Sequence, residues 1–258
     1  MLRSFTSPAA SRVKYSVCRP LIFSLSDVDS FNRLFVPVLR NRSDISAVIV
    51  ADGRGKAALL SRTPDGAWQN RLTDRAAWGK RQRWRTWRDD GQVIEDAWHD
   101  ADYDPLQRPW HAGAMRLPHD REVYWTEPYV FFERKDPGIT ASAKWRDARS
   151  GETFVIAFDV RLIDLSRFTS SLRIGESGRT ALLMDDGRVV GVPMHSSIRN
   201  DDDIKRAILR FPAEAGFDKH ATAWVHWERN GRLYERVERF DSDGRALVPL
   251  VKIYWPAT

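Results

Sequence analysis

Arg108 is the residue of this chain best suited to holding an anion. It precedes Pro109, and proline disfavours the helical conformation in the residue before it but is favoured at the first helical position. The sequence therefore predicts a helix that begins at Pro109, with Arg108 extended at its N-terminus. Free backbone N–H groups, partial positive charge and a guanidinium together suit a planar anion such as a carboxylate.

The two residues after Pro109 extend this candidate site. Trp110 can donate its indole N–H or stack on a ligand, and His111 can donate or accept a hydrogen bond. The alternative interpretation is structural: Arg108 pairs with Asp104 or another surface acid, and Trp110 packs in the core.

Asp159 is the matching candidate for a cation. It lies in TFVIAFDVRL, where alternation predicts a strand with a bulky face and an opposite face that carries Val155, Ala157 and Asp159. Small neighbours leave room for an ammonium group beside the carboxylate, and leaving a buried carboxylate unpaired would be costly. The alternatives are a pair with Arg161 on the same face, or exposure to solvent.

A third candidate segment is VYWTEPYVFF, residues 123–132. Pro128 cannot donate to a strand ladder, so the segment predicts an edge or bulged strand. Its alternation puts Trp125, Glu127, Tyr129 and Phe131 on one face and Phe132 on the other. Tyr129 and Phe131 are therefore either ligand-facing or core residues. Anion and cation sites together would suit a zwitterion such as an amino acid, whereas either alone would suit a carboxylate or an amine.

The elements around these candidates predict an α+β fold with antiparallel sheets. Asp27 predicts a helix start, and the apolar residues that follow it have helical spacing as far as Pro37, which is expected to kink or end the helix. Two apolar runs around Asp52-Gly53 predict a hairpin. Strands and helices then alternate with short connections, which favours antiparallel sheets over a wound parallel sheet.

The first hairpin has a counterpart later in the chain. AVIVADGR at 47–54 aligns without gaps with ALLMDDGR at 181–188, which favours two related modules. We expect modules at 27–172 and 173–258. Residues 1–26, rich in Ser and Arg, are expected to be irregular or a truncated helix, and their composition resembles an organellar transit peptide.

Composition limits the remaining functions. With 42% hydrophobic residues the chain can build a core, and its net charge of +6 comes with acids spread along the sequence. The basic run KRQRWRTWR at 80–88 either stacks nucleic-acid bases on Trp84 and Trp87 or forms a strand with one packed face. Its period of two favours the strand. No stretch approaches the roughly 18 apolar residues of a transmembrane helix, and no signal peptide is evident.

The sequence also predicts no catalytic or metal chemistry. Cys18 is the single cysteine, so the chain forms no internal disulfide, and the histidines lack metal-binding spacing. GxSxG, P-loop and GxGxxG motifs are absent. We therefore expect no enzyme and no cofactor; the alternative is an unrecognised enzyme that uses His111, Glu127 and Asp159 for acid–base chemistry.

Several motifs resemble those of double Cache domains, the PAS-like extracytoplasmic sensors of bacterial signal-transduction receptors. These are YDPLQRPWH, WTEPYVFF, PGITAS, FDV and RIGESGRTALLMDDGRVVGVP. The resemblance implies two PAS-like modules, each a central antiparallel sheet flanked by helices, with an N-terminal helix before them. It implies a membrane-distal module that binds ligand, a proximal module, and coupling to a chemoreceptor, kinase or cyclase output that this chain lacks.

The resemblance also implies a ligand site. The amino-acid-binding branch of the family uses a pattern that Tyr103, Arg108, Trp110, Tyr129 and Asp159 match. His111 stands where tyrosine is usual and Phe131 where an acid is usual, so carboxylate recognition by Arg108 and Trp110 fits better than amine recognition.

The expected protein is a sensor that detects an extracellular carboxylate or amino-acid-like ligand and signals to an output. The family implies a periplasmic or extracellular location and a homodimer formed through the N-terminal helix. A soluble anion- or nucleic-acid-binding protein using residues 80–88 is the alternative, although nucleic acid is not the expected partner.

Overall fold

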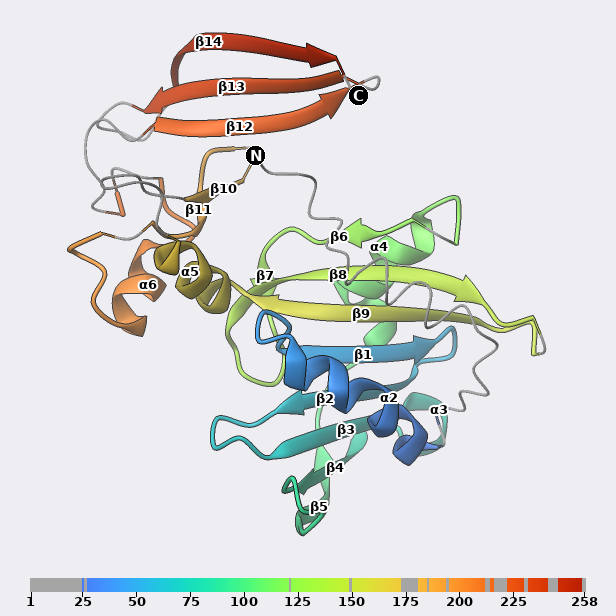
Figure 1. Cartoon of the computed structure of the whole chain (residues 1–258). Coiled ribbons are helices and arrows are strands. Elements are labelled where there is room, and N and C mark those ends of the chain that lie inside the picture. Colours follow the sequence, from blue (N-terminus) through green and yellow to red (C-terminus); the bar gives the residue numbers. More distant parts are fainter. Residues whose placement is uncertain are drawn as a thin grey trace. The chain divides into compact units, whose positions relative to one another are not determined.

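The chain forms two compact units, Lys14–Arg161 and Leu162–Thr258 together with Met1–Val13, drawn in the computed structural model of Figure 1. The structure describes residues 25, 27–120, 122–148, 150–172, 181–184, 186–193, 195–211 and 214–215, and the backbone of 222–229, 232–240 and 246–256. Cys18 and nearly all of residues 1–26 lie outside this part. The functional division at residue 172 stays a prediction, since the compact units divide after Arg161.

A nine-stranded antiparallel sheet forms the first unit, as the α+β prediction requires. Its order is β5-β4-β3-β2-β1-β9-β8-β6, and β7 also pairs with β8. The strands are β1 (Ala47–Asp52), β2 (Lys56–Arg62), β3 (Trp68–Asp74), β4 (Arg81–Trp87), β5 (Val93–Asp100), β6 (Tyr124–Trp125), β7 (Tyr129–Val130), β8 (Pro137–Arg146) and β9 (Thr153–Arg161). The predicted hairpin is β1–β2, and β9 pairs with the other edge of β1.

Two helices cover opposite faces of this sheet, α2 (Val28–Asn41) and α4 (Pro109–Arg116) (Figure 1). Asp27 caps α2 as predicted, because its side chain accepts a hydrogen bond from the backbone of Ser30. Pro37 lies inside α2 and does not end it, so of the two predicted effects, a kink or an end, the end does not occur. Leu39, beyond the proline, is buried with the rest of the apolar face, and this packing stabilises the last turn.

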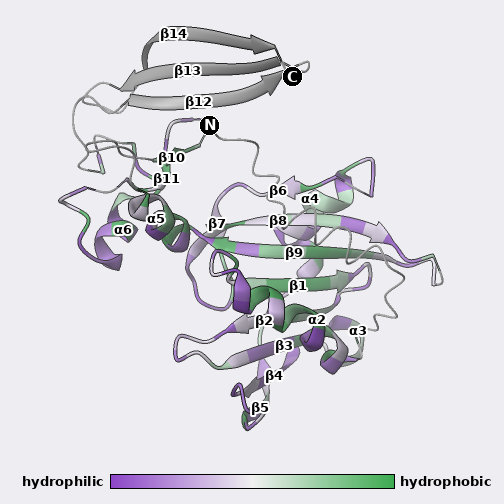
Figure 2. Cartoon of the chain, in the orientation of Figure 1, coloured by the Kyte–Doolittle hydropathy of each residue, from purple (hydrophilic) through white to green (hydrophobic). Residues whose placement is uncertain are grey.

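The two faces of β9 differ as predicted. Phe158, on the bulky face, packs against Phe35 of α2 with the ring centres 6.4 Å apart. Val155 and Ala157, on the other face, join Trp110 of α4 in one apolar cluster. Hydrophobic residues run along β1 and β9 in Figure 2, at the centre of the sheet. Small side chains therefore line the sheet beneath α4.

The remaining elements of the first unit are short. They are α3 (Arg75–Trp78) and a 3-10 turn, η1 (Pro105–Gln107), which leads into α4. The predicted strand at 123–132 is split into β6 and β7, and both lie at the edge of the sheet beside β8. This confirms the edge position expected from Pro128.

The second unit contains two small antiparallel sheets. Its elements are α5 (Leu162–Ser171), β10 (Leu182–Leu183), β11 (Val189–Gly191), α6 (Asp201–Ala207), β12 (Thr222–Arg229), β13 (Arg232–Phe240) and β14 (Ala246–Pro256). The predicted second hairpin is β10–β11. Helix α6 ends at Ala207, because the next residue, Ile208, is extended with φ −67° and ψ 149°. No helix in the described part of the chain is long and apolar enough to span a membrane.

Gly113 tests how tightly α4 packs against the sheet edge. A Cβ atom at this position would overlap the ring of Tyr124. In a free helix alanine is favoured over glycine by about 1 kcal/mol, but here we expect Gly113→Ala to lower the free energy of unfolding by about 1–3 kcal/mol through overpacking. Urea unfolding measures the change. A more stable variant would show that Tyr124 moves aside freely.

Candidate ligand-binding pocket

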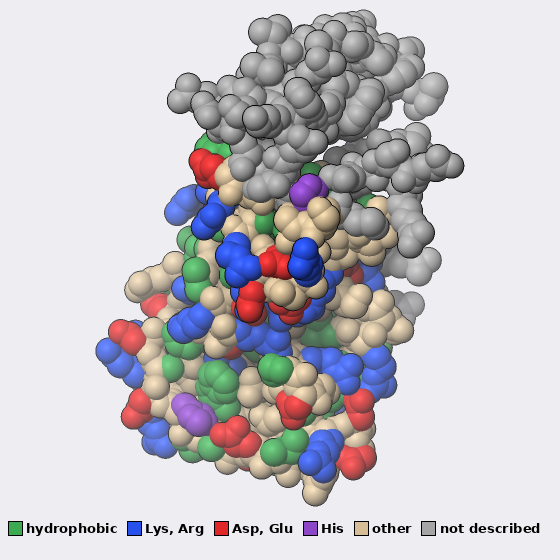
Figure 3. All heavy atoms as spheres, turned by 90° about the vertical axis from the view of Figure 1, so that its left-hand side faces the viewer, with side chains coloured by type: hydrophobic (Ala, Val, Ile, Leu, Met, Phe, Trp, Pro, Cys, Tyr) green, Lys and Arg blue, Asp and Glu red, His purple; other side chains and the backbone are tan. Residues whose placement is uncertain are grey.

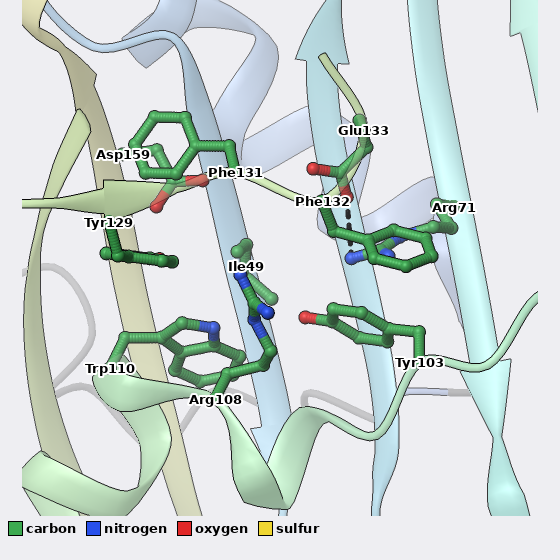
Figure 4. Close-up of a pocket in the computed structure, with 10 residues that line it drawn as sticks. All are labelled: Ile49, Arg71, Tyr103, Arg108, Trp110, Tyr129, Phe131, Phe132, Glu133 and Asp159. Atoms are coloured by element: carbon green, nitrogen blue, oxygen red, sulfur yellow. Dashed lines mark ion pairs between the residues drawn. The ribbon is translucent and has the colours of Figure 1, made fainter. Parts of the chain in front are cut away.

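A pocket lies on the face of the first unit's sheet that α4 covers (Figure 4). It is lined by Ile49, Arg71, Tyr103, Arg108, Trp110, Tyr129, Phe131, Phe132, Glu133 and Asp159. The gaps between the lining side chains and their open mouth add up to about 180 Å³ with open solvent included, and the space free for a water-sized molecule is about 10 Å³. That is room for about one water molecule, so a larger ligand requires the lining side chains to move apart.

Strand register brings the pocket residues of the sheet together. Arg71 on β3 is opposite Leu59 on β2, Leu59 is opposite Ile49 on β1, and Ile49 is opposite Ala157 on β9. Asp159 is two residues beyond Ala157, and residues two apart on a strand point to the same face. Arg71, Ile49 and Asp159 therefore all face α4.

Arg108 has the backbone geometry that the sequence predicts. Its φ and ψ are −74° and 143°, which is extended, and α4 begins at Pro109. One guanidinium nitrogen donates to the carbonyl of Val130 at 3.0 Å, and the guanidinium carbon lies 5.2 Å from the ring centre of Tyr129. Asp104 instead caps η1, accepting from the backbone of Leu106. Among the described residues no carboxylate lies within 4.0 Å of Arg108, so its charge is unpaired there.

Trp110 and His111 point in different directions. Trp110 lines the pocket, and its indole nitrogen points into the space near Arg108 in Figure 4. His111 is buried but is not among the lining residues. Consecutive residues of a helix are rotated by about 100°, which turns the His111 ring toward the backbone of Asp52. Burial lowers the pKa of His111, and its Nε2 has no described partner. The expectation that His111 contacts the ligand is therefore not met by this geometry.

Asp159 is buried, with 3% of its surface exposed. Its Oδ1 accepts a hydrogen bond of 2.6 Å from the hydroxyl of Thr140, and that hydroxyl oxygen is 2.7 Å from the Tyr129 hydroxyl. Because the Thr140 proton is used toward Asp159, Tyr129 is the donor to Thr140. Oδ2 of Asp159 accepts no hydrogen bond from the described residues. The alternative pair with Arg161 does not form, since Arg161 lies 3.6 Å from Asp136.

Burial also changes the acidity of this group. It raises the pKa of Asp159 to about 7, and the hydrogen bond from Thr140 offsets part of that effect. Burial and the nearby Asp159 carboxyl raise the pKa of Tyr129, which therefore stays protonated at neutral pH. Asp159 thus changes charge near neutral pH, while its hydrogen-bonded neighbours do not.

The sequence prediction missed a second buried cation in the pocket. Arg71 is 2% exposed, and its guanidinium carbon lies 3.7 Å from the ring centre of Tyr103. One of its nitrogens lies 2.6 Å from Oε1 of Glu133, although the angles of this ion pair do not meet hydrogen-bond geometry. A lone arginine in WQNRLTD looks like a solvent-facing residue. Only the register of β3 on β2 could have revealed that it faces the pocket.

The turn after β7 explains two further omissions. Strand alternation put Phe132 on the face opposite Phe131, but the chain leaves the strand at Val130, and both rings line the pocket. Glu133, in the same turn, also lines it. Trp125 and Glu127, which the same alternation put with Tyr129, are exposed instead.

Most of the predicted site residues come together in this pocket. They are Tyr103, Arg108, Trp110, Tyr129, Phe131 and Asp159. That they bind a ligand stays a prediction. Of the three residues considered for acid–base catalysis, Asp159 lines the pocket, whereas Glu127 and His111 do not. Within the described part of the chain, no group of three His, Cys, Asp or Glu side chains is placed to hold a metal ion.

The basic run at 80–88 forms the internal strand β4, as its alternation predicts. Arg83 makes two hydrogen bonds to Asp96, of 2.7 and 2.8 Å, and Lys80 lies 3.2 Å from Asp102. Acidic and basic side chains are also intermixed on the face shown in Figure 3. Much of the charge in this stretch is already neutralised, which leaves the nucleic-acid alternative with little support.

Comparison with known proteins gives structural matches only. No family model and no curated protein matches the sequence. The fold is similar to the ligand-binding domain of the Campylobacter jejuni chemoreceptor Tlp3 in complex with 4-methylisoleucine (TM-score 0.46, 13% identity, covering 90% of this chain and 74% of that one). It is also similar to the ligand-binding domain of Mlp24 with asparagine (0.42, 17%, 90% and 78%). A further match is the ligand-binding domain of the Pseudomonas fluorescens chemoreceptor CtaA with L-valine (0.41, 18%, 84% and 72%).

Replacing Asp159 by asparagine tests its burial. The pKa is about 7 in the folded chain against an ordinary 3.8, so the folded chain binds this proton more tightly. The titration of Asp159 therefore makes the free energy of unfolding fall as pH rises from about 4 to about 7. We expect Asp159→Asn, which keeps an acceptor for Thr140, to lose this dependence. At about pH 8 it should be more stable than the wild type by up to about 4 kcal/mol.

Urea unfolding at pH values on both sides of this interval measures the effect. Glu127→Gln removes an exposed carboxylate from the nearby edge segment and should leave the pH dependence of the wild type unchanged. If Asp159→Asn keeps the wild-type pH dependence, the carboxyl is not shielded from water as the structure indicates.

Proposed function

We propose that the first unit is the input domain of a sensor and that its pocket binds a small zwitterion of the α-amino-acid type. One observation carries this proposal. Among the described residues, Arg108 of this pocket has no carboxylate partner, and the buried carboxylate of Asp159 has one oxygen that accepts no hydrogen bond. An amino acid supplies a carboxylate for the first group and an ammonium for the second.

The end of the pocket proposed to bind the ligand's carboxylate, here called the anion end, consists of hydrogen-bond donors. Arg108 is held beside the pocket by its bond to Val130, and a planar guanidinium can give two parallel hydrogen bonds to a carboxylate. The indole N–H of Trp110 points into the same space (Figure 4). Since Arg108 is half-buried rather than fully exposed, a carboxylate bound there is screened less by solvent than at the surface.

The cation end depends on Asp159. An ammonium group favours the charged form of this carboxyl, and the Tyr129–Thr140 hydrogen bonds hold Oδ1 so that Oδ2 remains available. The aromatic faces of Tyr129 and Phe131 lie in the same lining and attract a cation through their π-electrons. These rings compensate in part for the missing acid at position 131, which the sequence pattern counted against amine binding.

The signalling role follows from the resemblance of the motifs. On this basis the domain lies on the periplasmic or extracellular side of the membrane. It dimerises through its N-terminal helix, carries out no catalysis and passes the bound state to an output domain.

Calorimetric titration with the common amino acids tests the proposed ligand class. For the tightest-binding amino acid, we expect the matched acid without the amine and the matched amine without the carboxylate each to bind about 10- to 100-fold more weakly. The reason is that each lacks one charge-assisted hydrogen bond. Equal affinity for the matched acid would remove Asp159 from the site.

Substitution of Arg108 tests the anion end. Arg108→Gln should weaken binding of the amino acid and of its matched acid about 10- to 100-fold while leaving the matched amine unaffected. Arg116→Gln, an exposed position on the last turn of α4, is the matched control and should bind as the wild type does. An Arg108 variant with unchanged affinity for both acids would contradict the assignment.

A further inference from the structure

Arg71 is the buried charged group that the proposed amino-acid site does not use. It enters the pocket from β3, between the rings of Phe132 and Tyr103 (Figure 4). Its Nε and Nη1 have no hydrogen-bond partner among the described residues, although the side chain is 2% exposed. Buried donors without partners are costly, and their presence beside a pocket points to a ligand atom that completes them.

Resting on the proposed function, we propose that Arg71 and Glu133, with Tyr103 and Phe132, form a second subsite that recognises the ligand's side chain and selects a terminal carboxamide.

The positions of Arg71 and Arg108 would allow one small ligand to reach both groups. The guanidinium carbon of Arg71 lies 3.7 Å from the ring centre of Tyr103, and that of Arg108 lies 5.8 Å from the same ring centre. The two groups cannot be further apart than the sum of these distances. That separation is within reach of the two ends of one small amino acid. Tyr103 therefore lies close to both the proposed carboxylate site and the side-chain subsite.

The charges of Arg71 and Glu133 determine which ligand side chain fits the subsite. Glu133 lies 2.6 Å from Arg71, so the pair is neutral overall but still rich in polar atoms. A second carboxylate from the ligand would be repelled by Glu133. An aliphatic side chain would leave the donors of Arg71 without partners.

A carboxamide satisfies both members of the pair. Its oxygen can accept from Arg71, and its NH₂ group can donate to Oε2 of Glu133, which makes no hydrogen bond within the described residues. The ion pair between Oε1 and Arg71 lacks hydrogen-bond angles, so a ligand group that accepts from Arg71 replaces no well-formed bond. The rings of Tyr103 and Phe132 cover the flat guanidinium and leave its edge for hydrogen bonding.

Titration of the full chain with amino acids of matched size tests the subsite. The probes are asparagine and glutamine, aspartate and glutamate, and valine and leucine. We expect asparagine or glutamine to bind at least about tenfold more tightly than the acidic and aliphatic amino acids of similar length. The double substitution Arg71→Met with Glu133→Gln should abolish this preference and keep the affinity for the aliphatic amino acids.

The double variant avoids leaving one charge of the pair buried alone, which would risk unfolding the domain. Arg83→Met with Asp96→Asn removes an ion pair elsewhere in the same sheet and should keep the wild-type preference.

Two results overturn the subsite. Equal or tighter binding of the aliphatic amino acids would do so, and so would tightest binding of an acidic amino acid by the wild type. Both leave the proposed amino-acid sensor standing. If none of the six amino acids binds, the subsite is overturned, and the titration with the other common amino acids separately decides the proposed function.

Discussion

The antiparallel pairing of β1 with β9 is the constraint on which the pocket depends. It joins two segments that are far apart in the sequence, with Ala47 opposite Asp159 and Ile49 opposite Ala157. The hairpin strands β2 and β3 extend one side of this pair and bring Arg71, whereas β8 extends the other and brings Thr140. A register shift of one residue would turn every side chain of β9 to the opposite face and would move Asp159 beneath α2.

The same pairing also places charged groups above an apolar face of the sheet, which is energetically unfavourable. The sheet face under α4 is lined with alanines and other small residues, and charged groups share the space above it. Removing such charges from water costs free energy that their neighbours repay only in part. Arg71 has Glu133 and an aromatic ring, but Arg108 and Asp159 form no ion pair within 4.0 Å in the part of the chain that the structure describes. Titratable groups in such surroundings are a common mark of functional sites, and a domain built only for stability would have used apolar side chains there.

Local chemistry in the sequence predicted several elements of the first unit but not β3 or α3. Proline at 109 fixed the start of α4 and the extended backbone of Arg108, and alternation along β9 separated Asp159 from the bulky core face. The errors came where tertiary packing overrides a local rule. Leu39 keeps α2 intact beyond Pro37, and helical rotation removes His111 from the pocket. Arg71 and Glu133 could not be found from local patterns, since one depends on the register of a third strand and the other on a turn that ends the alternation.

The hydrogen-bonded chain from Tyr129 through Thr140 to Asp159 makes the proposed ligand site sensitive to pH. Near neutral pH the carboxyl of Asp159 is shared between its protonated and charged forms, because its pKa is about 7. In the proposed amino-acid site, a ligand ammonium would compete with this proton and displace it. At lower external pH the proton would compete better, so the same ligand concentration would fill fewer sites. A sensor that used the proposed site would therefore respond less to its ligand in acidic surroundings.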